Sequence, residues 1–125
     1  MKKLLLLFIF IPLISFSQKD KMKNENKLIH LVFVKFKDGV SIDKFKDEAY
    51  RMLGNIEVVN NFQFSLNVSP EGYDRGFKHA FSMEFKTEYE RDSIYLPHPK
   101  HIEFGSKYWE DYIKDWMVYD YWEGD

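Results

Sequence analysis

Two segments of alternating pattern constrain the fold more than any other feature of this 125-residue chain. In residues 28–37 and again in residues 77–86, apolar side chains recur at every second position, which is the period of a half-buried β-strand. Between them, residues 42–54 have helical spacing with Ser41 as a candidate N-cap. Residues 57–68 are rich in β-forming side chains. This part of the chain therefore predicts a strand, a helix and two further strands.

The remainder of the chain predicts two helices and a final strand. A short helix is expected over residues 87–95 with Thr87 as its cap, a longer one from Pro99 to about Lys114, and a strand over residues 116–122. The order β-α-β-β-α-β indicates an α+β, ferredoxin-like fold: a four-stranded antiparallel sheet with both long helices on one face. We expect the first and third strands to be central neighbours that run parallel to each other.

The N-terminus predicts export. Residues 1–17 have a basic start at Lys2-Lys3, a short apolar run and small residues just before Gln18, which is the pattern of a cleaved secretory signal. Residues 18–27 are expected to be a flexible leader, and residues 28–123 the folded domain. The mature protein is thus predicted to be periplasmic or extracellular, with no membrane attachment; an uncleaved N-terminal anchor is the alternative.

Composition excludes several classes of function. The chain has no cysteine, so disulfides, thiol nucleophiles and lipid attachment at a cysteine are ruled out. Acidic residues outnumber basic ones, 20 to 18, which argues against nucleic acid as a partner. No phosphate-binding loop or nucleophilic serine motif is present, so nucleotide and covalent chemistry are not indicated. We expect no cofactor.

A histidine-rich turn stands before the second long helix. Tyr95, His98 and His101 fall within seven residues that also contain Pro97 and Pro99. Pro99 suits the first turn of a helix, where its missing N–H costs nothing. Histidine exchanges protons near neutral pH. His98, with a proline on either side, is expected to point outward or to cap the turn, whereas His101 lies inside the helix.

The two remaining histidines lie on the predicted strands. His30 and His79 each share a side with the apolar residues that follow them at every second position, and that side should face the helices. If the two strands run parallel, both histidines lie close together, and His101 and Tyr95 can join them in one pocket. Phe81 and Met83 would then form its walls. The alternative is that each histidine is separately hydrogen-bonded and structural.

The opposite face of the sheet is also partly apolar. Leu31, Phe33, Ala80, Trp116 and Val118 are expected there, and a two-layer fold usually buries such a face in a partner. A back-to-back homodimer is therefore predicted. The same parallel register would place Lys35 beside Glu84 on this face as an ion pair.

The chain resembles the stress-responsive A/B-barrel, or Dabb, family of dimeric α+β barrels. The resemblance spans residues 28–122 and rests on these segments: His30-Leu31-Val32-Phe33-Val34-Lys35-Phe36-Lys37, Asn67-Val68-Ser69-Pro70-Glu71-Gly72, Gly76-Phe77-Lys78-His79, Tyr95-Leu96-Pro97-His98-Pro99-Lys100-His101 and Val118-Tyr119-Asp120-Tyr121. It implies a homodimer whose two sheets close into a barrel.

The resemblance extends to polyketide cyclases of the olivetolic acid cyclase type, whose catalytic tyrosine and histidine match Tyr95 and His101, and whose further pocket histidines match His30 and His79. It implies two functions: binding of a small apolar or aromatic molecule in a His/Tyr-lined pocket, or an acid–base enzyme of the aldol cyclase or lyase type with His101 as base and Tyr95 as hydrogen-bond donor. A zinc site made of His30, His79 and His101 is a third hypothesis. We place binding first and metal last.

Overall fold

The computed structural model describes residues 26–124. The predicted signal peptide, residues 1–17, and all but the last two residues of the predicted leader lie outside the described residues. No helix in the described part of the chain is long and apolar enough to cross a membrane.

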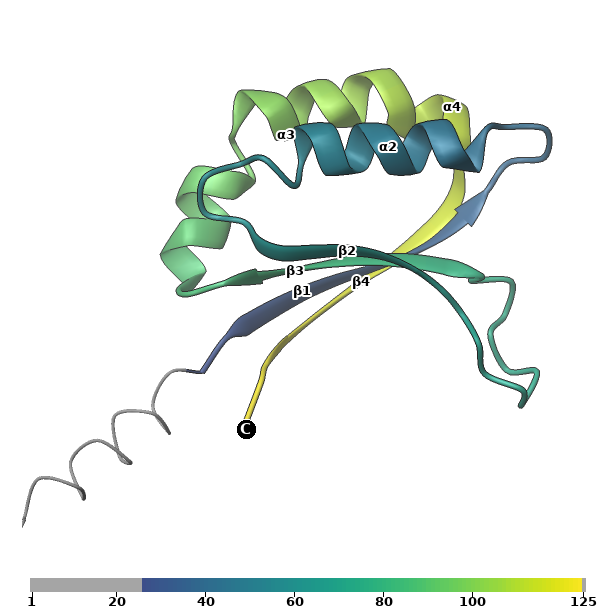
Figure 1. The fold of residues 1–125 in the computed structure, drawn as a ribbon, viewed down its shortest axis with the longest axis horizontal. Helices are drawn as coiled ribbons and strands as arrows, with labels where there is room; N and C mark the ends of the chain where they lie inside the picture. The colour runs from purple at the N-terminus through teal and green to yellow at the C-terminus, as the bar shows by residue number, and fades with distance from the viewer. Residues whose placement is uncertain (1–25, 125) are drawn as a thin grey trace, which may run out of the picture.

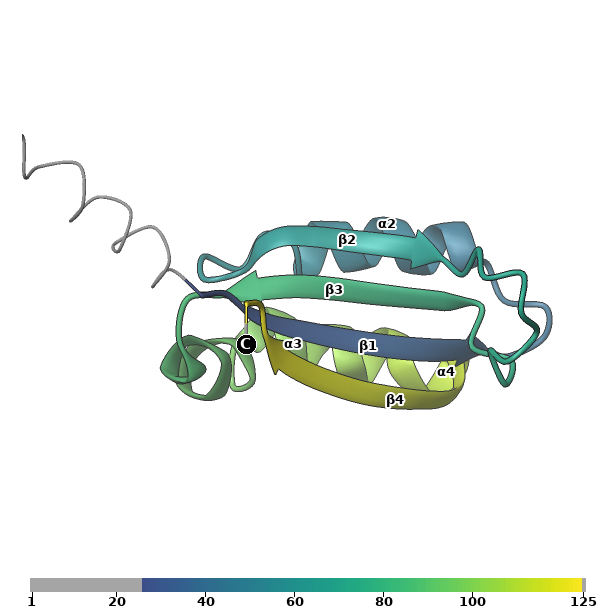
Figure 2. The same ribbon diagram turned by 90° about the horizontal axis from the view of Figure 1, so that it is seen from below.

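The described chain forms two layers, with all helices on one face of a single sheet (Figure 1). Its elements follow in this order: β1 (Leu28–Phe36), α2 (Ile42–Met52), β2 (Asn60–Leu66), β3 (His79–Phe85), the π-helix η1 (Glu90–Tyr95), α3 (Pro99–Phe104), the π-helix η2 (Gly105–Trp109), α4 (Glu110–Tyr112) and β4 (Ile113–Trp122). This confirms the ferredoxin-like α+β fold. Seen from below, the sheet shows its other face with no described element over it (Figure 2).

All strand pairs in the sheet are antiparallel, in the order β2-β3-β1-β4. The expectation that the first and third strands run parallel is therefore wrong. The crossover through α2 gives β1 and β2 the same direction, and the connection to β3 then reverses the chain. As a result His30 pairs with Met83, and His79 pairs with Val34.

The antiparallel register also overturns the predicted ion pair between Lys35 and Glu84. Glu84 lies opposite Ile29, at the other end of β1, and its carboxylate is 3.6 Å from the ammonium of Lys27. Lys35 instead lies opposite Asp115 of β4, 3.9 Å away.

Local capping follows the sequence pattern. The Ser41 hydroxyl accepts a hydrogen bond from the Lys44 amide at 3.2 Å, and α2 starts immediately after it. The Thr87 hydroxyl accepts one from the Glu90 amide at 3.1 Å. Pro99 occupies the first turn of α3, behind His98 as the N-cap. The helical run after Pro99 ends at Tyr112, earlier than predicted, because Ile113 already pairs with Phe36 in the sheet.

The core lies between the helices and the sheet and is dense in aromatic rings. Phe45 of α2 is fully buried and packs edge-on against Phe36 at 5.0 Å and Phe104 at 5.1 Å between ring centroids. Trp116 and Val118 lie opposite Val34 and Val32, so they face the helices. The expectation that these two side chains lie on the open side of the sheet is wrong. Met117, Tyr119 and Tyr121 take the open side instead.

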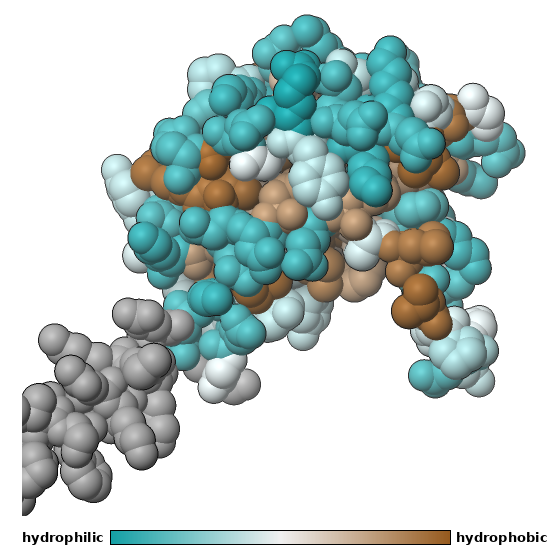
Figure 3. Space-filling model, viewed as in Figure 1, coloured by the Kyte–Doolittle hydropathy of each residue, from teal (hydrophilic) through white to brown (hydrophobic). Residues whose placement is uncertain are grey.

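The molecular surface has a corresponding pattern. Polar side chains cover the helix layer, and apolar side chains come to the surface below it, at the level of the sheet (Figure 3). A further exposed apolar group lies at the root of the loop that projects between β2 and β3, where Leu66 and Val68 are 62% and 86% exposed.

Candidate functional site

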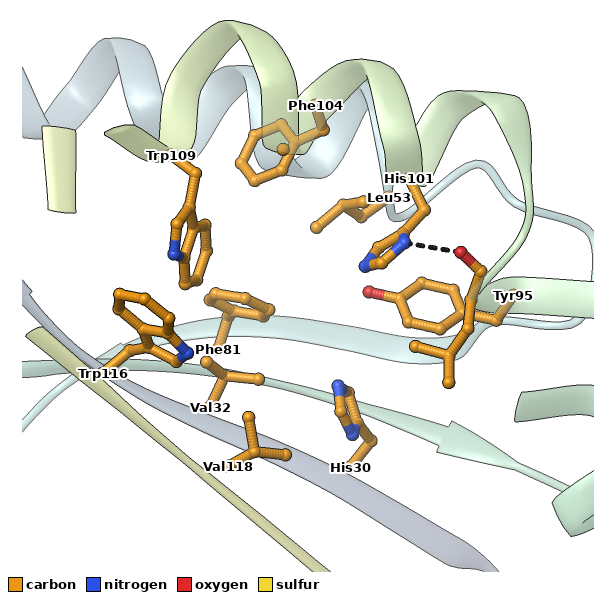
Figure 4. A pocket seen from close by; sticks show the side chains of 12 residues that line it. His30, Val32, Leu53, Phe81, Tyr95, His101, Phe104, Trp109, Trp116 and Val118 are labelled. Atoms are coloured by element: carbon orange, nitrogen blue, oxygen red, sulfur yellow. Dashed lines mark hydrogen bonds between the residues drawn. The ribbon is translucent and has the colours of Figure 1, made fainter. Parts of the chain in front are cut away.

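A cavity of about 300 Å³ opens between the helix layer and the β1–β4 half of the sheet (Figure 4). Its walls come from the sheet below, and from the segment 95–109 and Leu53 at the end of α2 above. Most of its lining is aliphatic or aromatic, and the ionisable groups are two imidazoles and one phenol. The lining residues are His30, Val32, Leu53, Phe81, Tyr95, Leu96, His101, Phe104, Gly105, Trp109, Trp116 and Val118.

His101 enters the cavity from the first turns of α3, above the sheet (Figure 4). Its Nδ1–H donates a hydrogen bond to the backbone oxygen of Leu96 at 2.9 Å. A carbonyl oxygen can only accept, so this bond fixes the tautomer of the neutral ring and leaves the Nε2 lone pair free. Burial among apolar side chains lowers the pKa of His101 below its ordinary value. The ring is therefore neutral at neutral pH and able to accept a proton.

Tyr95 lies at the end of η1 beneath His101, only 1% exposed to solvent. Its ring centroid is 4.6 Å from that of His101 and 5.8 Å from that of His30. Burial is the main cause that raises the pKa of the Tyr95 phenol far above its usual value, and the negative charge of Asp120 raises it further. Tyr95 therefore keeps its proton at any physiological pH and can act as a hydrogen-bond donor.

His30 is oriented by a chain of hydrogen bonds that no local sequence pattern indicated. Its Nδ1–H donates to the Asp120 carboxylate at 2.7 Å, across the β1–β4 pair in which the two residues are opposite each other. The other Asp120 oxygen accepts a hydrogen bond from the Arg91 guanidinium at 2.9 Å. This arrangement directs Nε2 of His30 away from the carboxylate. Asp120 belongs to one of the segments that carry the family resemblance, but only its pairing with β1 shows its partner.

The structure brings three of the four predicted polar residues to one cavity. His30, Tyr95 and His101 line it, and so does Phe81. Met83 is fully buried in the core beside them and does not line it. His79 lies at the other end of the sheet, because it pairs with Val34, four residues from His30 along β1; at the rise of a β-strand this is about 13 Å. Trp109 and Trp116 also line the cavity, and no local sequence pattern marked them as site residues.

Comparison with known proteins identifies the domain. The family model described as the stress responsive A/B barrel domain matches residues 28–123. The chain belongs to this family. The Arabidopsis thaliana A/B barrel domain-containing protein HS1 is 35% identical over 80 residues, which cover 62% of this chain and 72% of HS1.

Solved structures support the same A/B barrel fold. A Dabb-family protein from Mesorhizobium loti with a ferredoxin-like fold has a TM-score of 0.67 at 25% identity and covers 77% of this chain and 95% of its own. A hydroxynitrile lyase from Passiflora edulis has a TM-score of 0.69 at 18% identity, over 78% of this chain and 94% of its own. A ferredoxin-like protein from Bacteroides fragilis, described as dimeric, has a TM-score of 0.57 at 22% identity, over 76% of this chain and 94% of its own. At these two lower identities the likeness is one of fold.

The structure also bears on the predicted position of His98 and on the hypothesis of a zinc site. His98 caps α3 outside the cavity, as predicted: its Nδ1 accepts from the Lys100 amide at 3.1 Å, and its Nε2 is 3.2 Å from the Glu57 carboxylate. The proposed zinc site made of His30, His79 and His101 is wrong, because His79 lies at the far end of the sheet. Within residues 26–124 no three His, Cys, Asp or Glu side chains are grouped as a metal site.

Proposed function

We propose that this protein is an exported, homodimeric A/B barrel protein that binds a small apolar or aromatic molecule in the cavity bounded by His30, Tyr95 and His101. The observation that carries the proposal is the composition of the cavity wall. Trp109, Phe81 and other apolar side chains surround most of the space, and the two imidazoles and the phenol lie together on one side of it. Such walls with a few placed polar groups are typical of small-molecule sites.

The cavity volume limits the size of the ligand. A dry cavity of about 150 Å³ accommodates benzene, so the roughly twofold larger volume here, about 300 Å³, suits one aromatic ring with a short substituent. The neutral Nε2 of His101 can accept a hydrogen bond, and the phenol of Tyr95 can donate one. A ligand with a carbonyl or hydroxyl group beside its apolar part would use both.

The test uses acetophenone, an aryl ketone of this size. We expect saturable binding, read from the fluorescence of Trp109 and Trp116 in the cavity wall. Gly105→Leu is the blocking variant. Gly105 lines the cavity in a helical conformation, and an added Cβ there meets no atom within 4 Å, so the leucine has room to occupy the cavity without a clash at its base.

Gly105→Ala is the matched control, since it makes the same helix-favouring change with too little volume to fill the cavity. Binding should be lost in Gly105→Leu and kept in Gly105→Ala, while both variants remain as stable as the parent or become more so. Equal binding in both variants would show that the ligand lies elsewhere.

An acid–base enzyme of the aldol cyclase or lyase type is the second candidate function. The fixed tautomer and lowered pKa of His101 favour it, because they provide a neutral base at the cavity wall. Tyr95, held protonated, would donate a hydrogen bond to the oxygen of an enolate that forms when His101 takes a proton α to a carbonyl. The hydroxynitrile lyase of the same fold is an enzyme, and its likeness adds only that the fold can accommodate catalysis.

The homodimer is proposed from the uncovered face of the sheet. Met117, Tyr119 and Tyr121 are 48%, 57% and 43% exposed there, next to Leu31 and Phe33 of β1. A surface with this many large apolar side chains is unusual for a soluble monomer. A second copy with the same face would cover it symmetrically. The Bacteroides fragilis protein of the same fold is described as dimeric.

Export is proposed from the signal-like residues 1–17. The apolar run after Lys2-Lys3 is too short for a typical membrane-spanning helix, which needs about 20 residues. The mature chain would then begin at Gln18, and the mass of the intact secreted or periplasmic protein measures this. A chain that keeps Met1 and stays in the cytosol would contradict it.

A further inference from the structure

A second cavity lies at the opposite end of the domain, where His79 is. Its volume is about 520 Å³, and it lies where β1 ends and β3 and β4 begin, under the turn that leads into α2. It shares no lining residue with the cavity at His101. The residues that line it are Val34, Lys35, Phe36, Lys37, Asp38, Gly39, Val40, Ile42, Gly76, Lys78, His79 and Lys114.

Positive charge is concentrated around this second cavity. Four lysines line it against a single acid, Asp38, in a chain whose net charge is −2. Two of the four have carboxylate partners: Lys78 pairs with Asp74, and Lys35 lies 3.9 Å from Asp115.

The other two lysines, Lys37 and Lys114, have no such partner. In the described part of the chain no carboxylate lies within 4.0 Å of either ammonium, and Lys37 donates instead to the backbone oxygen of Glu110. Like charges held around one concavity repel each other, and a bound anion removes that repulsion.

The inner wall of this cavity is apolar. Val34 and Phe36 of β1 form part of it, and His79 lies beside them with its ring 5.3 Å from the Phe36 ring and 5.7 Å from that of Phe64. Burial lowers the pKa of His79, so the ring is neutral at neutral pH and adds no charge of its own. The cavity thus combines a cationic rim with an apolar floor.

We infer that this second cavity binds a small organic anion, with its carboxylate or phosphate group between Lys37 and Lys114 and its apolar part against Val34, Phe36 and His79. An inorganic anion would use the rim alone, and a neutral aromatic molecule would use the floor alone. A molecule with both parts uses both. This site is independent of the proposed function of the first cavity, since the two are built from different residues.

The experiment titrates the mature chain with benzoate at low ionic strength and follows binding by calorimetry and by the NMR signals of the His79 ring. We expect saturable binding that weakens as sodium chloride is added. Phenyl phosphate should also bind, inorganic phosphate should bind more weakly than either, and benzamide, which has the same shape without the charge, should not compete.

Lys114→Gln should weaken benzoate binding roughly tenfold, the effect of losing about 1.4 kcal/mol. Lys46→Gln is the matched control: Lys46 is also an exposed lysine, on α2, and lines neither cavity. It should leave the affinity unchanged. An equal loss in both variants would show only diffuse attraction to the surface and would overturn the site, as would the absence of saturable binding or of any change at His79.

Gly105→Leu separates this inference from the proposed function. It fills the first cavity, so benzoate binding at the second should be unaffected. If benzoate affinity falls in Gly105→Leu and not in Lys114→Gln, benzoate occupies the first cavity and the second site is refuted.

Discussion

Tyr119→Asp should convert the proposed dimer into monomers. Tyr119 lies on the open face of the sheet, opposite Leu31 of β1, and is 57% exposed in the single chain. In a symmetric back-to-back dimer the substitution buries two carboxylates without partners, one from each copy. Each unpaired buried charge costs several kcal/mol, so the dissociation constant should rise by more than about a hundredfold. Light scattering at micromolar concentration measures the change in mass.

Tyr89→Asp is the matched control for this prediction. Tyr89 is also exposed, at 68%, but it immediately precedes η1 and is not on the sheet. The same tyrosine-to-aspartate change there should leave the dimer intact. A parent protein that is already monomeric at micromolar concentration, or a Tyr119→Asp variant that stays dimeric, would refute the proposed interface.

His101→Ala should abolish proton transfer if the second candidate function is correct. The assay is the exchange of the α-protons of acetophenone for deuterium in D₂O, followed by NMR. A positioned general base contributes about 10²–10⁴-fold, and that factor is the expected loss. The fold should be kept, because His101 makes its hydrogen bond to a loop carbonyl and is not in the deep core.

His98→Ala is the control, since His98 caps the same helix but does not line the cavity. Its exchange rate should stay close to that of the parent. Tyr95→Phe should lower the rate with little loss of affinity, because the phenol proton is needed mainly as the enolate forms. A larger loss in His98→Ala than in His101→Ala would show that the base has been assigned to the wrong histidine.

The pH dependence of the exchange has a defined sign. The base form of His101 exists above its pKa, and burial lowers that pKa below the ordinary value, which is about 6.5. The exchange rate should therefore already be at its plateau at neutral pH. It should fall only as the pH drops toward and below the lowered pKa of His101. A rate still rising above pH 7 would contradict the assignment. A parent protein with no exchange at all would leave binding as the function.

The alternation of apolar residues was sufficient to predict the faces of β1 and β3. His30 and Val32 point toward the helices as the pattern requires, and the side of each strand that lines the core follows from it. Alternation carries no information about strand direction. Because β1 and β3 were expected to run parallel, His79 was predicted to lie next to His30, and Lys35 was predicted to pair with Glu84. Both predictions fail in the antiparallel sheet.

β4 shows a second limit of the sequence pattern. Trp116, Val118 and their neighbours are apolar at both odd and even positions, so no alternation assigned a face to them. Val118 pairs with Val32, which faces the helices, so Val118 and Trp116 face the helices as well. The same pairing places Asp120 against His30, and η1 then brings Arg91 to that carboxylate. These contacts join segments distant in the chain, which no local motif describes.

The most direct test of the proposed function is the location of bound acetophenone by intermolecular nuclear Overhauser effects. We expect contacts between the ligand's aromatic protons and the rings of Tyr95 and Trp109, and none with His79 in the second cavity. Contacts with the His79 ring, or no saturable binding to the parent protein, would contradict it.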